Sequence, residues 1–442
     1  MALIDDIFTA GVIGAGGAGF PTHKKLVPCE LLIINAAECE PLLASDRYVM
    51  RNFAAELVAG AKLVAESLGI GRVVVGTKRK YTEEIAALRS EIDTQRAAVE
   101  VCELDSFYPL GDEQVLIYEI TGKTVPPGGI PIALGIVVVN VTTLLNIFRA
   151  SQGTPVTRRF VTVNGEVGHP CVVDAPVGAS PEDLIAAAGG ARVASYSLVR
   201  GGPMMGRQYP GGVTGLGFGK ADGGLLVLPS NNKIFTLAAQ PIEHVVLQAR
   251  STCIQCTLCT ELCPRYLIGH VMRPHRVMRS IAVPDSAANT AGAVDALLCC
   301  ECGICELFSC PMGLSPRRMN VLMKGQLRAS GTKPNTEIRP EQSRSREYRR
   351  IAQSRFIERL DLGGYSDHLY DCVRLDPQQV KIPLKHGVGR PSAACVAEGS
   401  EVAVGDVIGY VEQNDVGCLV HASIPGVVTA VDAEYITIRR AS

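Results

Sequence analysis

The stretch CIQCTLCTELCP, at residues 253–264, specifies how the middle of this chain folds. Its cysteines are separated by two, two and three residues, and a proline follows the last one. This is the spacing of a run that binds [4Fe–4S] clusters. Three close thiolates on one loop can hold three irons of a cubane, and a distant fourth thiolate closes the site. The proline ends the local helix and directs the chain away.

A second run follows at residues 299–311, CCECGICELFSCP, with one extra residue before its last cysteine. In two-cluster ferredoxins, the fourth cysteine of each run binds the other cluster. The same exchange here gives the first cluster the ligands Cys253, Cys256, Cys259 and Cys310. It gives the second cluster the ligands Cys299, Cys302, Cys305 and Cys263. The exchange places the clusters close enough for electrons to pass between them.

Two zinc sites are the alternative interpretation of these cysteines. Zinc binds paired CxxC motifs, but it does not need a third and a fourth cysteine followed by proline at this spacing. Iron–sulfur clusters therefore remain the prediction. Cys300 stands beside Cys299 and is expected not to be a ligand, because Cys299 alone keeps the spacing.

The composition narrows the class of protein. The chain has 442 residues, of which 47% are hydrophobic and 20% are charged, so it can bury cores and is not disordered. Its formal net charge of −1 argues against a nucleic-acid partner. No apolar run is long enough for a membrane span, and the acidic N-terminus is unlike a secretory signal. Sixteen cysteines in such a chain indicate metal or redox chemistry in the cytoplasm rather than disulfides.

Residues 1–150 alternate between apolar strands and helices, which favours a mostly parallel sheet covered by helices. The expected strands are 31–34, 72–76, 99–104 and 136–141. The expected helices are 51–68 and 81–89.

The rest of the chain divides by composition. The predicted segments are a β-rich α+β domain at 157–240, the cysteine motifs on short helices at 245–330, a polar, arginine-rich helical linker at 331–375 and a third β region at 376–442. Within the first of these, 159–167 is predicted to be a hairpin with Asn164 and Gly165 as its turn. The basic residues of the linker are expected to be solvated.

A glycine-rich loop near the N-terminus, GAGGAGFP at 14–21, can bring backbone amides close to a phosphate. A packing turn is the alternative, because no strand is predicted directly before the loop. The stretch NAAECEP at 35–41 favours the ligand, since it directly follows a predicted strand, where α/β sheets bind ligands. Residues 111–113 form a further acidic turn, and Asn140 ends the last strand of this region.

Three of these motifs together resemble known flavoproteins. GAGGAGFPTHKK at 14–25, NAAECEP at 35–41 and NVTT at 140–143 are similar to motifs of the FMN- and NADH-binding subunit of respiratory complex I and of the C subunit of Rnf complexes. The order of the segments resembles the PduS-type cobalamin reductases over nearly the whole chain. That resemblance implies a multidomain α/β and α+β protein, with a Rossmann-like flavin-binding domain at 1–150, a soluble-ligand-binding β-grasp domain at 157–240, a two-cluster ferredoxin-like helical insert at 245–330 and a barrel-sandwich β domain at 376–442.

The resemblance also implies which residues bind the cofactors. The FMN phosphate and ribityl chain would contact Gly14, Gly16, Gly17, Lys25 and Asn140. The isoalloxazine or ribityl end would contact Asn35 and Glu38. NADH would stack on Phe20 and lie near the acidic turn of Gly111 and Glu113. The chain departs from the complex I pattern at Ala15, Ala37 and Val139, where that pattern has Arg, Asp and Asn.

The function implied by the resemblance is that of a flavin and iron–sulfur oxidoreductase. NADH would deliver a hydride to FMN, and single electrons would then pass through the two clusters to a corrinoid. One alternative is an electron-relay subunit like the C subunit of Rnf complexes, without NADH activity of its own. Another is a non-catalytic binding module that has lost its flavin site.

The remaining segments carry less specific expectations. The β-grasp domain could hold the corrinoid or could be a spacer; it has no Asp-x-His-x-x-Gly run, which supplies a cobalt ligand in many corrinoid proteins. The barrel-sandwich domain resembles lipoyl domains but has no lysine in its hairpin region, 412–415, so it is expected to be unmodified. The resemblance places the protein in the cytoplasm or inside a bacterial microcompartment, with shell or enzyme partners.

Overall fold

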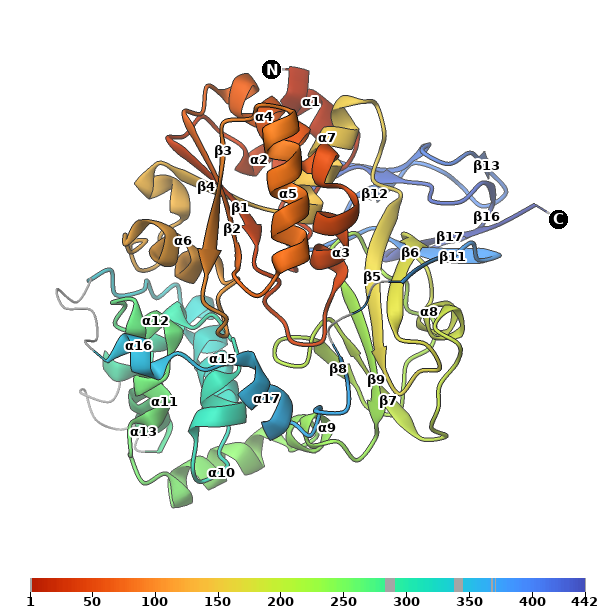
Figure 1. The fold of residues 1–442 in the computed structure, drawn as a ribbon. Coiled ribbons are helices and arrows are strands. Elements are labelled where there is room, and N and C mark those ends of the chain that lie inside the picture. The colour runs from red at the N-terminus through yellow and green to blue at the C-terminus, as the bar shows by residue number, and fades with distance from the viewer. Residues whose placement is uncertain (1, 283–290, 338–344, 367–368, 370, 442) are drawn as a thin grey trace.

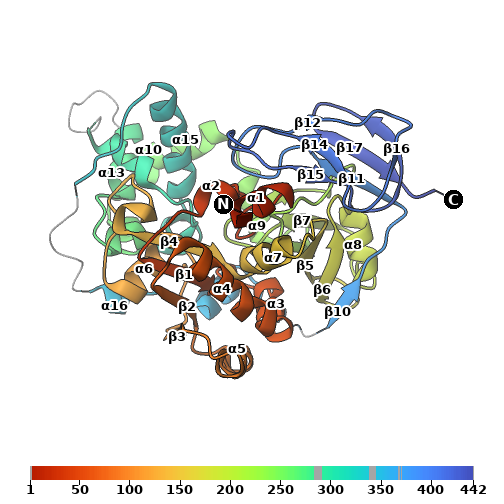
Figure 2. The ribbon, with the colours of Figure 1, turned by 90° about the horizontal axis from the view of Figure 1, so that it is seen from above.

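The computed structural model describes residues 2–282, 291–337, 345–366, 369 and 371–441. Figure 1 shows an N-terminal α/β unit next to a second β unit, with the helices of the cysteine-rich segment below the first unit. In the turned view, the C-terminal β unit lies beside α1 and the second unit (Figure 2). Among the described residues, no helix is both long enough and apolar enough to cross a lipid bilayer.

The N-terminal sheet is parallel, with its strands in the order β3-β2-β1-β4. Its strands are β1 Leu31–Ala36, β2 Arg72–Lys78, β3 Val99–Leu104 and β4 Ile136–Asn140. β1, β2 and β4 contain continuous apolar runs because helices cover both faces of the sheet, whereas the edge strand β3 carries Glu100 and Glu103. Leu32 and Ile34 belong to the core on one face, and Leu31 and Ile33 belong to the core on the other.

Helices complete the two outer layers of this unit. The first face packs against α1 Ala2–Thr9, α3 Ser45–Asn52, α4 Ala54–Leu68, α5 Thr82–Thr94 and α7 Val141–Ser151. The second face packs against α6 Glu113–Thr121. The short α2 Thr22–Lys25 and η1 Pro131–Leu134 lie in connections. The helix expected at 51–68 is divided at Phe53, which leaves helical geometry with φ −128° and packs its ring on Phe160.

The order of the strands creates a ligand-binding edge. β2 and β3 follow on one side of β1, whereas β4 returns to its other side. Ligands of open α/β sheets bind outside the carboxyl ends of the strands at such a reversal. Asn35 of β1 and Asn140 of β4 are partners in the strand register at this point. The fold therefore brings together two residues that the resemblance assigned to one cofactor.

The second sheet is mixed, with its strands in the order β10-β6-β5-β9-β7-β8. Its strands are β5 Arg158–Gly165, β6 Cys171–Pro176, β7 Tyr196–Arg200, β8 Arg207–Tyr209, β9 Gly224–Pro229 and β10 Cys372–Arg374. One face packs against α8 Pro181–Ala187. The other face packs against α9 Lys233–Ala238 and α17 Gln353–Arg359.

The hairpin predicted at 159–167 is wrong. β5 continues through Asn164 and Gly165 and pairs antiparallel with β6, so the chain turns only after these residues. Asn164 is buried and donates from Nδ2 to Ser366 O (2.8 Å). Gly165 has φ +101°, and a Cβ there would lie 2.1 Å from Val227 O of β9. The Asn-Gly pair therefore serves a close strand contact rather than a turn.

Short helices carry the cysteine runs. They are α10 Ile242–Thr252, α11 Leu258–Glu261, α12 Pro264–Leu267, α13 Pro274–Ala282, η2 Val294–Leu298, η3 Cys305–Ser309 and α15 Pro316–Ala329. Their apolar sides meet in a core that includes Val245, Val277 and Met319. α12 begins at the proline that follows Cys263, because proline suits the first turn of a helix.

The C-terminal unit consists of two small sheets, ordered β11-β17-β16-β13 and β12-β14-β15. Its strands are β11 Gln379–Pro383, β12 Ala393–Ala394, β13 Glu401–Val402, β14 Val407–Tyr410, β15 Val420–His421, β16 Gly426–Val431 and β17 Tyr435–Arg439. Apolar residues from both sheets form one core, which includes Ile382, Ile408 and Ile436. The two sheets therefore pack face to face.

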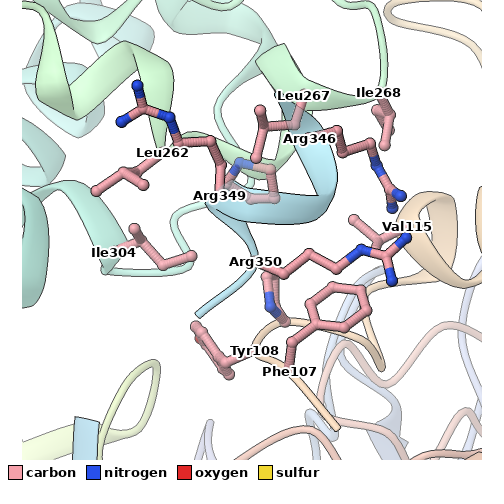
Figure 3. Close-up of a pocket in the computed structure, with 12 residues that line it drawn as sticks. Phe107, Tyr108, Val115, Leu262, Leu267, Ile268, Ile304, Arg346, Arg349 and Arg350 are labelled. Carbon is pink, nitrogen blue, oxygen red and sulfur yellow. The ribbon is translucent and has the colours of Figure 1, made fainter. Parts of the chain in front are cut away.

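The basic segment around α16 Arg346–Arg349 is not solvated as expected. Arg346 is only 8% exposed; it pairs with Glu119 of α6 and lies over the Tyr118 ring. Figure 3 shows the arginines of this segment in a pocket between α6 and the cysteine-bearing helices. The arginines thus join the N-terminal unit to the cluster segment. Residues 338–344, 367–368 and 370 of the expected linker lie outside the described residues.

Candidate active site

A cavity of about 620 Å³ opens at the reversal between β1 and β4. Its size falls in the range of roughly 300–1,000 Å³ typical of small-molecule sites. The N-terminal unit forms one wall, and the region from the end of β7 to the start of β9 forms another. All ten residues predicted to bind cofactors line it: Gly14, Gly16, Gly17, Phe20, Lys25, Asn35, Glu38, Gly111, Glu113 and Asn140.

The glycine-rich loop forms one edge of this cavity. Ala15 N donates to Thr143 Oγ1 (2.8 Å), which ties the loop to the first turn of α7. Gly17 has φ +108°, and no atom lies within 4 Å of the position that a Cβ would take. The loop therefore presents its backbone to open space, which fits a ligand-binding loop better than a packing turn.

The C-terminal unit supports this loop from behind. Gly19 has φ +65°, and a Cβ there would lie 2.4 Å from His386 O. Val388 N donates to Ala18 O (3.1 Å). Two backbones approach closely here, so the barrel-like unit helps to fix the shape of the cofactor loop.

Asn35 and Asn140 use their side chains to fix the strand ends. Asn140 Oδ1 accepts a hydrogen bond from Thr142 N (2.9 Å), so this residue caps α7. Its Nδ2 donates to Asp46 Oδ2 (2.7 Å). Asn35 Nδ2 donates to Gly111 O (2.9 Å). The two amides thus connect the strands to the loops that complete the cavity.

Lys25 and Glu113 form an ion pair of 2.8 Å on the cavity wall, with side chains that are 31% and 36% exposed. The resemblance assigned Lys25 to FMN and Glu113 to NADH, and the structure brings the two together. An ion pair this exposed contributes only about 0.2–1 kcal/mol, so a charged ligand can separate its partners.

Buried charges surround Glu38 at the end of β1. Its Oε2 accepts from Asp46 N (3.3 Å), and its carbonyl accepts from Lys78 Nζ (2.6 Å). Burial first, and then the negative charge of Asp46, raise the pKa of Glu38 to about 8. Burial also raises the pKa of Asp46. Glu38 therefore holds a proton at neutral pH.

Replacing Glu38 by Gln is expected to change the pH dependence of stability. The pKa of Glu38 in the folded protein, about 8, lies above its ordinary value of 4.5. The folded state therefore binds this proton more tightly. The contribution of this bound proton to the unfolding free energy is complete below pH 4.5 and is lost as the pH rises to about 8.

Glutamine does not titrate. As the pH rises across this range, the unfolding free energy of Glu38→Gln should therefore increase relative to that of the wild type. Chemical unfolding of both proteins at several pH values between about 5 and 8 measures the difference. A difference that stays constant with pH would contradict the raised pKa.

The thiols predicted to bind the first cluster lie close together. Burial first, and then the charges of Cys253, Cys256 and Cys310, raise the pKa of Cys259 to about 12. Gln255 Nε2 donates to Cys253 Sγ (3.2 Å). The last cysteine of the second run thus lies beside the first run, as an exchange of ligands requires.

The thiols predicted to bind the second cluster line one small cavity. Its walls include Cys263, Cys299, Cys302 and Cys305. Burial raises the pKa of Cys305, and the neighbouring Cys299, Cys259 and Cys263 raise it further, so the two groups of thiols are adjacent. In the described part of the chain, no three His, Cys, Asp or Glu side chains are placed to hold a single metal ion. A cubane does not need such a placement, because each of its thiolates binds a different iron.

Cys300 also lines the small cavity, beside a buried arginine. A hydrogen bond with Cys302 first, and then the charge of Arg265, lower the pKa of Cys300 to about 7. Arg265 Nη2 in turn donates to Asp112 Oδ2 (2.8 Å), and Asp112 lines the large cavity. A chain of polar groups therefore runs between the two cavities.

Cys302 joins the two cavities directly, because it lines both of them. The buried Tyr108 holds it in place by donating from its hydroxyl to Cys302 O (2.7 Å). A cofactor in the large cavity and a cluster on Cys302 would therefore share one wall.

The chain is similar to known proteins over almost its whole length. The cobalamin reductase PduS of Salmonella typhimurium is 39% identical to this chain over 437 residues, which are 98% of this chain and 95% of that protein. This chain belongs to the PduS family. The PduS of Citrobacter freundii is 38% identical to it, again over 98% of this chain and 95% of its own length.

Other proteins match part of this PduS-family chain. The C subunit of the Na(+)-translocating ferredoxin:NAD(+) oxidoreductase complex of Acetobacterium woodii is 34% identical to it over 59% of this chain and 57% of that protein. A solved NAD+-reducing [NiFe]-hydrogenase in the H2-reduced state covers 76% of this chain and 63% of its own, with 22% identity and a TM-score of 0.49.

Four domain families match successive parts of this member of the PduS family. They are the Nuo51 FMN-binding domain at residues 7–149, the SLBB domain at 160–208, the 4Fe-4S dicluster domain at 252–315 and the RnfC barrel sandwich hybrid domain at 373–441. The protein is therefore a multidomain α/β protein with an FMN-binding domain, a 4Fe–4S domain and a barrel-sandwich domain.

Several charged residues of the PduS-family cavity carry no local signal in the sequence. Arg159 and Arg200 come from strands of the second sheet, and Asp222 comes from the loop before β9; all three reach the cavity only through tertiary packing. Arg200 and Asp222 pair with each other. The sequence gives only a weak indication that Asp46 belongs to the site, namely that this carboxylate follows soon after the motif at 35–41.

Proposed function

We propose that this chain is a cobalamin reductase that carries electrons from NADH through FMN and two [4Fe–4S] clusters to a corrinoid. Two relatives similar to it over almost its whole length are named as cobalamin reductases. The observation that carries the proposal is the shared wall. Cys302 borders both the cavity lined by all ten predicted FMN and NADH residues and the cavity of the second cysteine group.

The groups around the large cavity suit FMN. Gly16 and Gly17 present exposed backbone at one edge, and Arg159 supplies a buried guanidinium. Asn35 and Glu38 add hydrogen-bonding groups at the end of β1. When bound, FMN supplies the chemistry that accepts a hydride and gives up single electrons.

The side chains of the cavity position the donor and control protons. Phe20 is half-buried in the wall, so a face of its ring can stack on a nicotinamide. The carboxyl of Glu38 holds a proton at neutral pH, which it can give to a ligand beside it. Lys25 and Glu113 can separate to contact charged parts of a dinucleotide.

The cysteines divide into two ligand sets in this proposal. The first cluster takes Cys253, Cys256, Cys259 and Cys310, and the second takes Cys299, Cys302, Cys305 and Cys263, with Cys300 free. Backbone N–H of Glu301 donates to Cys299 Sγ (3.3 Å), and such bonds to cluster sulfurs tune the reduction potential. With these ligands the second cluster would lie beside the large cavity and the first cluster next to the second, and the clusters would supply one-electron chemistry there.

The other units complete the proposal. The segment 157–240 is a β-grasp domain that forms one wall of the cofactor cavity. A domain that served only as a spacer between the other units would not need to line the cavity. The segment 376–442 is an unmodified barrel-sandwich that supports the glycine-rich loop through His386 and Val388. We place the protein in the cytoplasm or a bacterial microcompartment, where its partners would be shell proteins or corrinoid enzymes.

Anaerobic mixing tests the proposal. Protein loaded with iron, sulfide and FMN should lose its flavin and cluster absorbance on addition of NADH. It should regain this absorbance when cob(III)alamin is added, while the cobalamin spectrum changes to that of a reduced form. Protein stripped of flavin is the control and should show neither change with NADH.

A relay without NADH activity is the second candidate function. The pairing of Lys25 with Glu113 favours it, because Glu113, the acidic residue assigned to NADH, must leave Lys25 before it can contact the dinucleotide. A relay would keep its flavin absorbance in NADH, yet would pass electrons to cobalamin after chemical reduction. That result would replace the reductase by a relay protein resembling the C subunit of Rnf complexes.

A further inference from the structure

Arg159 brings a buried positive charge from the second unit into the cavity of the first. It lies near the start of β5, is only 5% exposed and lines the large cavity. Its neighbour Arg158 is absent from the cavity wall and pairs with Asp174 and Asp376 instead. The alternation of a strand separates the two arginines, so only one of them reaches the cofactor site.

Two hydrogen bonds fix the guanidinium of Arg159, but not all of its N–H donors have an acceptor. Its Nη2 donates to Ala15 O (2.9 Å) in the glycine-rich loop, and its Nε donates to Asp222 O (3.2 Å). Its Nη1 is buried and has no hydrogen-bond partner among the described residues. An arginine has five N–H donors, and a buried donor left unpaired costs free energy. The geometry therefore leaves a fixed, charged donor without an acceptor at the base of the glycine-rich loop.

The acidic side chains of the cavity, Asp46 and Glu38, do not form ion pairs with Arg159. In the part of the chain that the structure describes, no ion pair within 4.0 Å joins Arg159 to Asp46 or Glu38. Asp46 is occupied by hydrogen bonds from Asn140 Nδ2 (2.7 Å) and Thr142 Oγ1 (2.9 Å). Asp46 and Glu38 interact with the charge of Arg159 only through space, so its unpaired Nη1 donor remains available to an anion entering beside the loop.

We propose that Arg159 binds the phosphate of FMN, so that the second unit supplies a buried cation to the first unit's cofactor site. This inference rests on the proposed function, which places FMN in the cavity. The exposed backbone of Gly16 and Gly17 lies in the same loop as the Ala15 carbonyl that holds Arg159. Arginine suits this task because its planar fork can give two N–H groups to one phosphate. Flavin binding would then require both units to be in place.

The binding of FMN and of riboflavin, which lacks the phosphate, separates this role from a structural one. Flavin-stripped protein with its clusters intact is titrated with each flavin, and quenching of flavin fluorescence gives the dissociation constants. Arg159→Met should weaken FMN binding by about tenfold or more, as expected for the loss of a charged hydrogen bond. Its affinity for riboflavin should stay within about twofold of the wild type. Arg158→Met, the matched control on the same strand, should keep the wild-type preference for FMN.

Two further variants keep the test decisive if Arg159→Met does not fold. Arg159→Lys should retain part of the preference for FMN, whereas Arg159→Gln, which can still donate to Ala15 O, should lose it. If FMN and riboflavin binding were weakened equally, Arg159 would serve only to hold the loop in shape, and the proposal would be overturned. An unchanged affinity for FMN would also overturn it. A wild type that binds neither flavin would instead defeat the proposed function.

Discussion

Replacing Cys263 by Ala is expected to destroy the cluster of the second cysteine run, although Cys263 belongs to the first run. In the structure, Cys263 lines the small cavity with Cys299, Cys302 and Cys305. Iron content should fall from about eight to about four per chain, since each cubane contains four irons. Electron transfer from NADH to cobalamin should fall to background, because the lost cluster is the one beside the large cavity.

Comparison of variants shows which cluster has been lost. The EPR spectrum of reduced Cys263→Ala should match that of Cys302→Ala. By the same exchange, the spectrum of Cys310→Ala should match that of Cys256→Ala. Cys300→Ala is the matched control, because this thiol shares the small cavity and should leave both clusters in place. A Cys263→Ala spectrum identical to that of Cys256→Ala would mean that each run binds its own cluster.

Replacing Gly111 by Val is expected to remove the flavin while leaving the clusters. A Cβ at Gly111 would lie 2.7 Å from Cys39 Cβ and 3.0 Å from Ala37 O. The larger side chain must push apart two loops of the cavity, including the one held by the bond from Asn35 Nδ2 to Gly111 O. Overpacking of this kind lowers the unfolding free energy by about 1–3 kcal/mol.

Flavin released on heating and iron content measure the effect of Gly111→Val. The dissociation constant for flavin should rise by about tenfold or more, because a loss of about 1.4 kcal/mol in binding is a factor of ten, and flavin per chain should fall as a result. Iron should be unchanged. Gly71→Val is the control, since Gly71 lies in the same unit with no atom within 4 Å of its Cβ position. A variant that keeps its flavin would show that this turn does not shape the site.

The sequence alone predicts the parts of this protein that depend on local spacing. The spacing of the cysteines predicts which thiols lie together, because each group combines three closely spaced cysteines of one run with a single cysteine from the other run. Most strands of the N-terminal sheet are equally local, since continuous apolar runs such as 136–139 form them. The glycine-rich loop could be recognised as a motif, and the structure places it at the edge of the cavity.

The errors come from positions where tertiary packing decides. Asn164 and Gly165 form a pair typical of hairpin turns, yet neighbouring strands and a distant carbonyl keep them inside β5. The charge-rich segment around Arg346 was expected to be solvated, and its acidic and aromatic partners lie on α6. No local pattern reveals that Arg159 approaches Ala15, because that contact joins two separate units.

The central claim is that electrons enter at the large cavity and leave it through the cluster on Cys302. Stopped-flow absorbance after mixing with NADH, in the presence of cob(III)alamin, tests it most directly when wild type and Cys263→Ala are compared. In the wild type, flavin bleaching should be followed by reduction of cobalamin. In Cys263→Ala, the flavin should bleach at the wild-type rate and the cobalamin should remain oxidised. Reduction of cobalamin at the wild-type rate by Cys263→Ala would contradict the account.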